Sequence, residues 1–477
     1  MPGIPRNLWV NLLFGCLSSA ASSLTNGGFF SNYIVSIGLG DTAVGLIFST
    51  AGLVMVALAV PLGILTDRLA RQVLLRAGVA AGLASAVAQT LALQLRHVPL
   101  LYAAAGLSGM ASAIVGPALA ANFADSIQTG DRTLLYTWQY SGSIAAGALG
   151  PLAALPYLYY RGNAWEVGTL TVVMQAGNAI YMVAYLLLLL IRDDAVLGKE
   201  SEGVLAKEAG SGSGSGSADA EAPLLERAAD ADAAPAASGG APAASKQALG
   251  LGHQTLALGC CTLRVRHIPY LLFASDITIA LGAGASIAFF PLYFTQGLQP
   301  GLTPMALSAV FAGLPLLIAL AGFLLVPLSK RMGRAPAALA ANLVGTAALF
   351  ALVFIRTPWV AISTYLLRSS AMNASYAVQR GILMDVVSKE NRGKWSSVEN
   401  LTAATWTGSS LVGGFLVQRY SFQTVFFGTA CLYCVGNVIL ALVTPLTWGE
   451  KVDAGKAAAG PEEGQAPLEG ASVNASE

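Results

Sequence analysis

The stretch GILTDRLAR, residues 63–71, places three charged side chains between two long apolar runs. One run covers residues 42–65 and the other covers residues 73–93. Each is long enough to cross a bilayer, which takes about 20 apolar residues. Because only a few residues separate the two predicted helices, they run antiparallel, and the charges lie at the membrane surface.

The composition of the chain is that of a membrane protein. Of its 477 residues, 55% are hydrophobic and 11% are charged, whereas soluble domains carry about 25% charged residues. Five cysteines without paired spacing do not predict a disulfide framework. The net charge of +1 points to no particular partner, and we expect no nucleic acid among the partners. The lipid bilayer is the expected environment.

Membrane-length apolar runs occur twelve times, six on each side of a long polar interval. They predict an all-α membrane protein with twelve transmembrane helices, arranged as two pseudo-symmetric six-helix bundles. The first run is too long for a cleaved signal peptide and is expected to be a retained helix. The predicted spans are 9–33, 42–65, 73–94, 98–123, 133–157, 168–191, 269–294, 303–328, 335–355, 358–384, 395–418 and 422–446.

Four segments follow from this pattern. Two are the six-helix bundles, and two are a cytoplasmic linker and a cytoplasmic tail that are expected to be disordered. The linker contains GSGSGSGS and much Ala, Pro and Asp, a composition that cannot bury a core. Its last part, 249–265, is more apolar and is a candidate for the membrane surface. The segments are 1–191 (first bundle), 192–267 (linker), 268–446 (second bundle) and 447–477 (tail).

Lysine and arginine decide the predicted orientation, because they favour cytoplasmic loops. With the N-terminus inside, 13 of them lie in the inner loops and tails outside the linker, and 4 lie in the outer loops. Both termini are therefore predicted to be cytoplasmic. The pattern does not distinguish a plasma membrane from an internal membrane.

The two halves repeat one another. Asp125 and Arg132 recur as Asp385 and Arg392, in both cases 260 residues later. A shared offset of this kind indicates duplication of a six-helix unit.

The charged turn at residues 63–71 resembles a known family motif. Gly63, Asp67, Arg68 and Arg71 match the signature motif between helices 2 and 3 of the major facilitator superfamily, which this chain resembles. The second half has VPLSKRMGR, residues 326–334, at this place, without the glycine and the acid. The resemblance implies two parallel six-helix halves that alternate access to a solute site near the membrane midplane.

The resemblance also implies a cytoplasmic gate. Asp67 would contact the N-terminus of helix 11, whose free N–H groups carry partial positive charge. Arg71 would pair with Asp125 and hold the inner side closed in the outward-facing state. The alternative is that these charges only fix the topology. The other residues of the expected gate are Gly63, Arg68, Arg132, Asp385 and Arg392.

Several functional classes receive no support. The chain has no GxxxxGK[ST] loop, so ATP-driven transport is not expected. Its three histidines lie outside the spans, and no cluster has metal-ligand spacing. We expect no enzyme activity, no cofactor and no metal, and we expect a monomer.

Two charged residues lie deep in predicted spans, where a charge costs about 2.5–3.5 kcal/mol and faces a cavity or a partner. Asp276 lies roughly 10 Å deep in helix 7, and Arg368 lies roughly 15 Å deep in helix 10, at about 1.5 Å per residue. The resemblance implies that helices 1, 4, 7 and 10 line the cavity. One hypothesis is that Arg368 contacts an anionic group of the solute while Asp276 balances it or carries a proton. The alternative is a structural Arg368–Asp276 ion pair, or a pair made with other residues.

Helical periodicity adds further candidates. Arg368, Ser375 and Gln379 share one stripe of helix 10 with Tyr365 and Met372. On helix 1, a polar strip is formed by Ser19, Ser22, Ser23 and Asn26.

Helix 11 carries two further residues to consider. Glu399 is a second candidate for a proton-linked carboxylate, although a negative charge is favoured in the first turns of any helix. Trp138, in helix 5, and Trp406 are expected to pack or to lie at the interface rather than to clamp a solute.

These patterns predict a gradient-driven secondary active transporter for a small organic solute. The leading solute class is an anion or zwitterion, because of Arg368, with H⁺ as an optional coupling ion. One alternative is an exporter of lipophilic cations. An alternative of another class is a transporter-like receptor or scaffold that does not transport.

Overall fold

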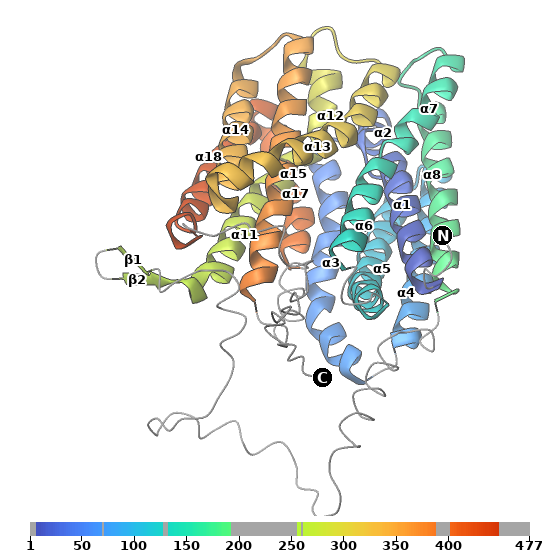
Figure 1. Ribbon diagram of the computed structural model, residues 1–477. Helices are drawn as coiled ribbons and strands as arrows, with labels where there is room; N and C mark the ends of the chain where they lie inside the picture. The colour runs from blue at the N-terminus through green and yellow to red at the C-terminus, as the bar shows by residue number, and fades with distance from the viewer. Residues whose placement is uncertain are drawn as a thin grey trace, which may run out of the picture.

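Apolar runs form helices throughout the part of the chain that the structure describes, and the helices pack in two halves (Figure 1). The computed structural model describes residues 6–68, 71–126, 132–191, 255–258, 261–387 and 401–447. The first half contains α1 (Arg6–Thr25), α2 (Gly28–Ser36), α3 (Asp41–Arg68), α4 (Arg71–Leu95), α5 (Val98–Asp125), α6 (Arg132–Ala146), α7 (Leu149–Tyr160) and α8 (Val167–Leu188).

The second half repeats this order. Its regular elements begin with short strands and end with a 3₁₀ turn. They are β1 (Thr255–Leu258), β2 (Cys261–Arg264), η2 (Val265–His267), α11 (Ile268–Ile287), α12 (Phe290–Leu292), η3 (Tyr293–Gly297), α13 (Pro304–Met332), α14 (Arg334–Phe354), α15 (Pro358–Val386), a helix over 401–408, α17 (Ser410–Arg419), α18 (Phe422–Ala441) and η5 (Pro445–Thr447).

The predicted twelve-helix architecture is confirmed. Within the described ranges, nine stretches are long and apolar enough to span a membrane by themselves. The other three predicted spans are formed by α6 with α7, by α15, and by the helix over 401–408 with α17. These three are interrupted or carry charged residues, which lowers their hydropathy.

Four spans that the sequence predicts as continuous are interrupted. The breaks follow α1 at Asn26 and Gly27, α6 at Gly147, α11 at Ala288, and the helix over 401–408 at Ser409. Glycine weakens a helix interior by about 1 kcal/mol relative to alanine, which accounts for the first two breaks.

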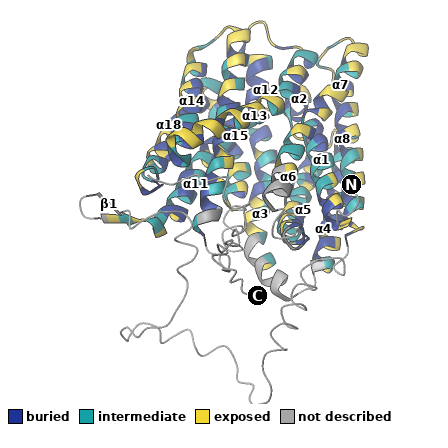
Figure 2. Ribbon diagram, viewed as in Figure 1, coloured by how far each residue is buried: buried dark blue, intermediate teal, exposed yellow. Residues whose placement is uncertain are grey.

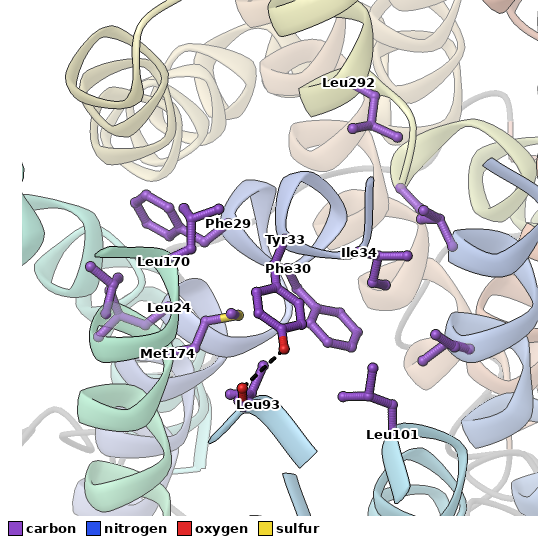
Figure 3. Packing of buried hydrophobic residues seen from close by; sticks show 14 of the residues in the cluster. Leu24, Phe29, Phe30, Tyr33, Ile34, Leu93, Leu101, Leu170, Met174 and Leu292 are labelled. Carbon is purple, nitrogen blue, oxygen red and sulfur yellow. Dashed lines mark hydrogen bonds between the residues drawn. The ribbon is translucent and has the colours of Figure 1, made fainter. Parts of the chain in front are cut away.

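One buried cluster joins residues of both halves at one end of the bundle (Figure 3). Phe29, Phe30, Tyr33 and Ile34 of α2 lie at its centre, with Tyr33 and Ile34 fully buried. The Tyr33 hydroxyl donates to the Leu93 carbonyl at 3.0 Å. Figure 2 shows buried residues on the helix faces inside the bundle and exposed ones on the outer faces, as expected where lipid is the solvent.

The end of the linker corrects one prediction. The linker is predicted to be disordered, but within its last part β1 and β2 pair antiparallel. Whether 249–265 lies on the membrane surface stays a prediction. Leu263 and Val265 pack against the buried cluster at the adjacent end of the second half. The short runs TLAL and CTLR therefore have a core to pack against. The rest of the linker, 192–254, and the tail from 448 lie outside the described residues.

Candidate functional site

The two halves are joined at one end of the molecule, the top of Figure 1, where α2, α7 and α12 lie. Trp165 Nε1 donates to the Leu302 carbonyl at 3.0 Å, and Ser308 Oγ donates to the Pro151 carbonyl at 2.8 Å. On the opposite side of this end, Thr42 N donates to Gln418 Oε1 at 3.1 Å, and Ser31 Oγ donates to the Ala288 carbonyl at 2.9 Å. These four hydrogen bonds between the halves all lie near this end.

Close backbone contact also joins the two halves at this end, and we call the joined region the seal. A Cβ atom on Gly45 of α3 would lie 2.4 Å from the Ser410 carbonyl oxygen and 3.0 Å from Gly414 Cα of α17. Backbone atoms cannot turn aside as a side-chain tip can, so only glycine lets α3 and α17 come this close. The strands β1 and β2 lie toward the other end of the molecule (Figure 1).

A cavity of about 620 Å³ lies between the halves, on the inner side of this seal. This volume is within the range of about 300–1,000 Å³ that is typical of small-molecule sites. Its wall is built from α1 to α6 and α8 of the first half, and from α11 to α13, α15 and the helix pair over 401–419 of the second.

The two walls differ in chemistry. The wall from the second half is mainly apolar and aromatic, and its hydroxyl groups already have partners within the protein. Thr407 donates to the Ala403 carbonyl, Ser410 donates to the carbonyls of Thr407 and Gly45, and the Tyr365 hydroxyl lies beside Ser369. Polar side chains gather on the wall from the first half. They include Ser19, Ser22, Asn26, Gln89, Asn178 and Tyr181. Among the described residues, no Asp, Glu, Lys, Arg or His lines the cavity.

The predicted polar strip of helix 1 lies in the cavity wall. Ser19, Ser22, Ser23 and Asn26 all line it, and Asn26 is exposed. The Tyr181 hydroxyl of α8 lies beside Ser22 and Asn26. The strip therefore offers hydroxyl and amide groups to a solute, without a charge.

Arg368 does not lie where the sequence predicts it. Its side chain is 4% exposed and does not line the cavity. Its Nη2 donates to the Tyr433 hydroxyl, and its guanidinium carbon lies 5.1 Å from the ring centroid of Phe290. The cation is held by aromatic rings inside the second half, and the Tyr365 ring forms the cavity wall nearby.

The predicted helix 10 is α15, and two further residues of its stripe, Ser375 and Gln379, also face neighbouring helices rather than the cavity. Ser375 donates to Asn342 Oδ1 of α14, and Gln379 Nε2 lies 3.4 Å from Ser375 Oγ. Both side chains are at most 4% exposed. The periodicity correctly groups these residues on one face, but most of that face meets α14 and α18 rather than the cavity. Only Tyr365 reaches the wall.

The remaining predicted residues lie elsewhere or outside the described part. Asp276 is half-buried in α11 and is not among the lining residues. Glu399 and Arg392 lie outside the described residues. For the rest of the predicted gate the structure describes the backbone, in α3 to α6 and α15, but not the side chains. These residues are Gly63, Asp67, Arg68, Arg71, Asp125, Arg132 and Asp385.

Sequence reasoning missed the contribution of α8. Asn178, Tyr181 and Tyr185 follow a helical stripe on α8 and all line the cavity. An asparagine in the middle of an apolar span was the available signal. Trp406, which was expected to pack or to lie at the interface, also lines the cavity.

Comparisons with known proteins agree with this architecture. The family model described as Major Facilitator Superfamily matches residues 12–298 and 272–472. No curated protein sequence matches the chain. Among solved structures, a mutant form of the nucleoside transporter NupG is 13% identical with a TM-score of 0.58, and the match covers 93% of this chain and 100% of that one.

Two further structures are similar over most of their length. A bacterial homologue of the iron transporter ferroportin, in an inward-facing state, is 13% identical with a TM-score of 0.59, over 92% of this chain and 98% of that one. A D-xylose-proton symporter is 12% identical with a TM-score of 0.59, over 93% and 97%. At these identities the likeness shows the fold alone, whereas the family model covers most of the chain. The chain therefore belongs to the major facilitator superfamily and is a multi-pass membrane transporter rather than an enzyme.

Proposed function

We propose that this transporter moves a small, uncharged organic solute with one polar and one apolar face. The observation that carries the proposal is the cavity wall, which has no charged side chain among the described residues. An ion in such a cavity would lose most of its hydration without gaining a counter-charge. A neutral solute loses far less.

The apolar wall and the polar wall together favour a solute that has one apolar face and one polar face. Ile287, Pro291, Phe311 and Ile318 offer the second half's apolar surface. Burying apolar area there contributes about 25 cal/mol per Å². On the opposite wall, hydroxyl and amide groups need hydrogen-bond partners once water is displaced. A solute with hydroxyl, carbonyl or amide groups at one end satisfies both walls.

The preference for an anion or zwitterion rested on Arg368. That guanidinium is engaged with Tyr433 and Phe290 and is 4% exposed, so it is not placed to meet a solute. A lipophilic cation would find aromatic rings in the cavity, but no carboxylate among the described lining residues. Both charged classes therefore rank below an uncharged solute.

Alternating access follows from the seal. On the predicted topology, with both termini cytoplasmic, the joined end is the outer one and the cavity belongs to an inward-facing state. Transport requires this seal to open while the inner ends of the halves come together. The predicted gate, with Arg71 and Asp125, is the proposed inner closure.

The energy source is a separate question, and we propose a coupled proton. Asp276 and Glu399 are the carboxylates that the sequence singles out for it. The similarity to a protein named a D-xylose-proton symporter makes the same coupling reasonable here. If Asp276 carries the proton, Asp276→Asn abolishes solute accumulation driven by a pH gradient but keeps exchange between equal solute concentrations.

The test is solute flux into vesicles that contain the purified protein. Radiolabelled neutral, anionic and cationic solutes of similar size are compared, with and without a pH gradient. We expect uptake of neutral solutes only. Uptake confined to ions would contradict the proposal, and binding without flux for every solute would favour the receptor alternative.

A further inference from the structure

The cavity extends into the first half between α1, α4, α5 and α8. We call this region the N-terminal lobe and define it by Ser22, Gln89, Ser108, Asn178 and Tyr181, one or two residues from each helix. All five side chains are polar and uncharged.

Asn178 is the unusual member of the lobe. It lines the cavity and is 1% exposed, yet neither its Oδ1 nor its Nδ2 has a hydrogen-bond partner in the protein. It is the one side chain in the described ranges with two such atoms. Since buried polar groups are nearly always bonded, an amide with both atoms unmet points to a partner from outside the chain.

Two other buried asparagines each keep one bonded amide atom, although Asn11 Oδ1 and Asn437 Oδ1 have no partner in the protein. Asn11 Nδ2 donates to Asn122 Oδ1 at 2.9 Å within the same half. In the last helix of the other half, Asn437 also follows a glycine and is buried, but its Nδ2 donates to Thr346 Oγ1 at 2.9 Å. Asn437 does not line the cavity. Burial of an asparagine beside a glycine is therefore not enough to leave its amide unpaired.

The fold holds Asn178 firmly in position. A Cβ atom on the preceding Gly177 would lie 2.6 Å from Thr25 Cγ2 and 2.8 Å from Leu24 Cβ, so α8 is pressed against α1. Further along α8, the Tyr181 and Tyr185 rings stack with centroids 6.0 Å apart. A fixed amide next to stacked rings discriminates between solutes better than a mobile one does, because less conformational freedom is lost on binding.

We propose that Asn178 determines specificity by bonding a donor and an acceptor that lie side by side on the solute. A carboxamide offers one carbonyl acceptor and an NH₂ donor in one plane, so its complement is a planar cyclic amide edge. A vicinal diol offers a similar but puckered pair. Because the side chain is 1% exposed, the solute displaces a neighbouring side chain to reach it. This inference rests on the proposed transport of an uncharged solute.

Three bicyclic probes of similar size test the inference by equilibrium binding to the purified full-length protein. They are 3,4-dihydro-2(1H)-quinolinone, which has the amide edge, its N-methyl derivative, which lacks the donor, and cis-1,2-indanediol. We expect the N-methyl derivative to bind about tenfold more weakly than the parent, since each neutral hydrogen bond contributes modestly. Equal binding of the parent and the N-methyl derivative overturns the inference. Preference for the diol assigns the site to hydroxyl pairs instead and overturns the cyclic amide.

Two matched variants locate the effect. Asn178→Leu removes both unmet polar atoms, so it is expected to leave the melting temperature unchanged or higher and to abolish the preference for the parent amide. Asn437→Leu loses its bond to Thr346, so it is expected to lower the melting temperature and to keep the preference. Asn178→Thr provides a second substitution with the same expected loss. A preference that survives both Asn178 variants contradicts the assignment.

The outcomes also separate this inference from the proposed function. If the neutral probes bind without any preference between amide and N-methyl forms, the uncharged solute stands and the role of Asn178 fails. If only charged compounds bind, both fail.

Discussion

Helices α5 and α15 occupy the same place in the two halves, yet they give the cavity different walls. Ser108 and Arg368 lie 260 residues apart, the offset that also relates Asp125 to Asp385. Ser108 lines the cavity, whereas Arg368 is buried against Tyr433 and Phe290. Duplication preserved the order of the helices and not the chemistry of their faces.

The difference shows how the second half accommodates a charge in a membrane. The guanidinium lies over aromatic rings and donates to a phenol, which offsets part of the cost of desolvation. Its Nε has no partner, so the compensation is incomplete. An arginine in this arrangement lies inside the second half and adds no charge to the cavity wall that the described residues form.

The largest expected effect comes from giving the first half the charge of the second. Ser108→Arg places a guanidinium in the cavity without the rings that hold Arg368. We expect uptake of neutral solute to fall more than about 100-fold, because an unpaired buried charge costs several kcal/mol. The assay is uptake into reconstituted vesicles. Ser108→Ala is the control and should retain most uptake; neutral uptake that survives the arginine would contradict an uncharged cavity.

A smaller effect is expected from removing the charge of the second half. Arg368→Met keeps an apolar stem but leaves the Tyr433 hydroxyl without its partner, at a cost of about 1–3 kcal/mol. We expect a melting temperature several degrees lower, with neutral solutes still preferred over ions. A melting curve and a binding titration on the native variant measure the two effects. If the variant is stable but binds no solute, Arg368 contributes to solute binding and this account is wrong.

The smallest effect compares one phenol from each wall. Tyr181→Phe removes a hydroxyl beside the polar strip, and we expect about five- to tenfold weaker solute binding, the value of one hydrogen bond. The Tyr365 hydroxyl lies beside Ser369, which we expect to remain its partner when solute binds, so Tyr365→Phe should change affinity less than about twofold. Binding titrations of both variants give the ratio of the two losses in solute affinity. Equal losses would mean that the two walls do not differ as described.

The sequence predicts much of this fold because long apolar runs and charged turns are local signals. The six-plus-six pattern and the polar strip of Ser19 to Asn26 are in the structure as predicted. The breaks at Gly27 and Gly147 are not predicted, because a glycine within an apolar run is equally compatible with a continuous helix.

The site was harder to predict, for a physical reason. Helical periodicity places Arg368, Ser375 and Gln379 on one face, but it does not say whether that face meets the cavity or a neighbouring helix. The answer depends on residues distant in sequence, Tyr433 and Asn342, which supply the partners. A search for charged residues within spans also overlooks Asn178, which is neutral. It is distinctive only because its amide has no hydrogen-bond partner in the protein, and the sequence does not show this.

The most direct test of the central claim is a thermal-shift series on the purified wild-type protein, with one molecular skeleton in neutral, anionic and cationic forms. Ligands that bind the folded state raise its melting temperature by mass action. The account predicts that the neutral form stabilises the protein and that both charged forms do not. Stabilisation by a charged form alone would contradict it.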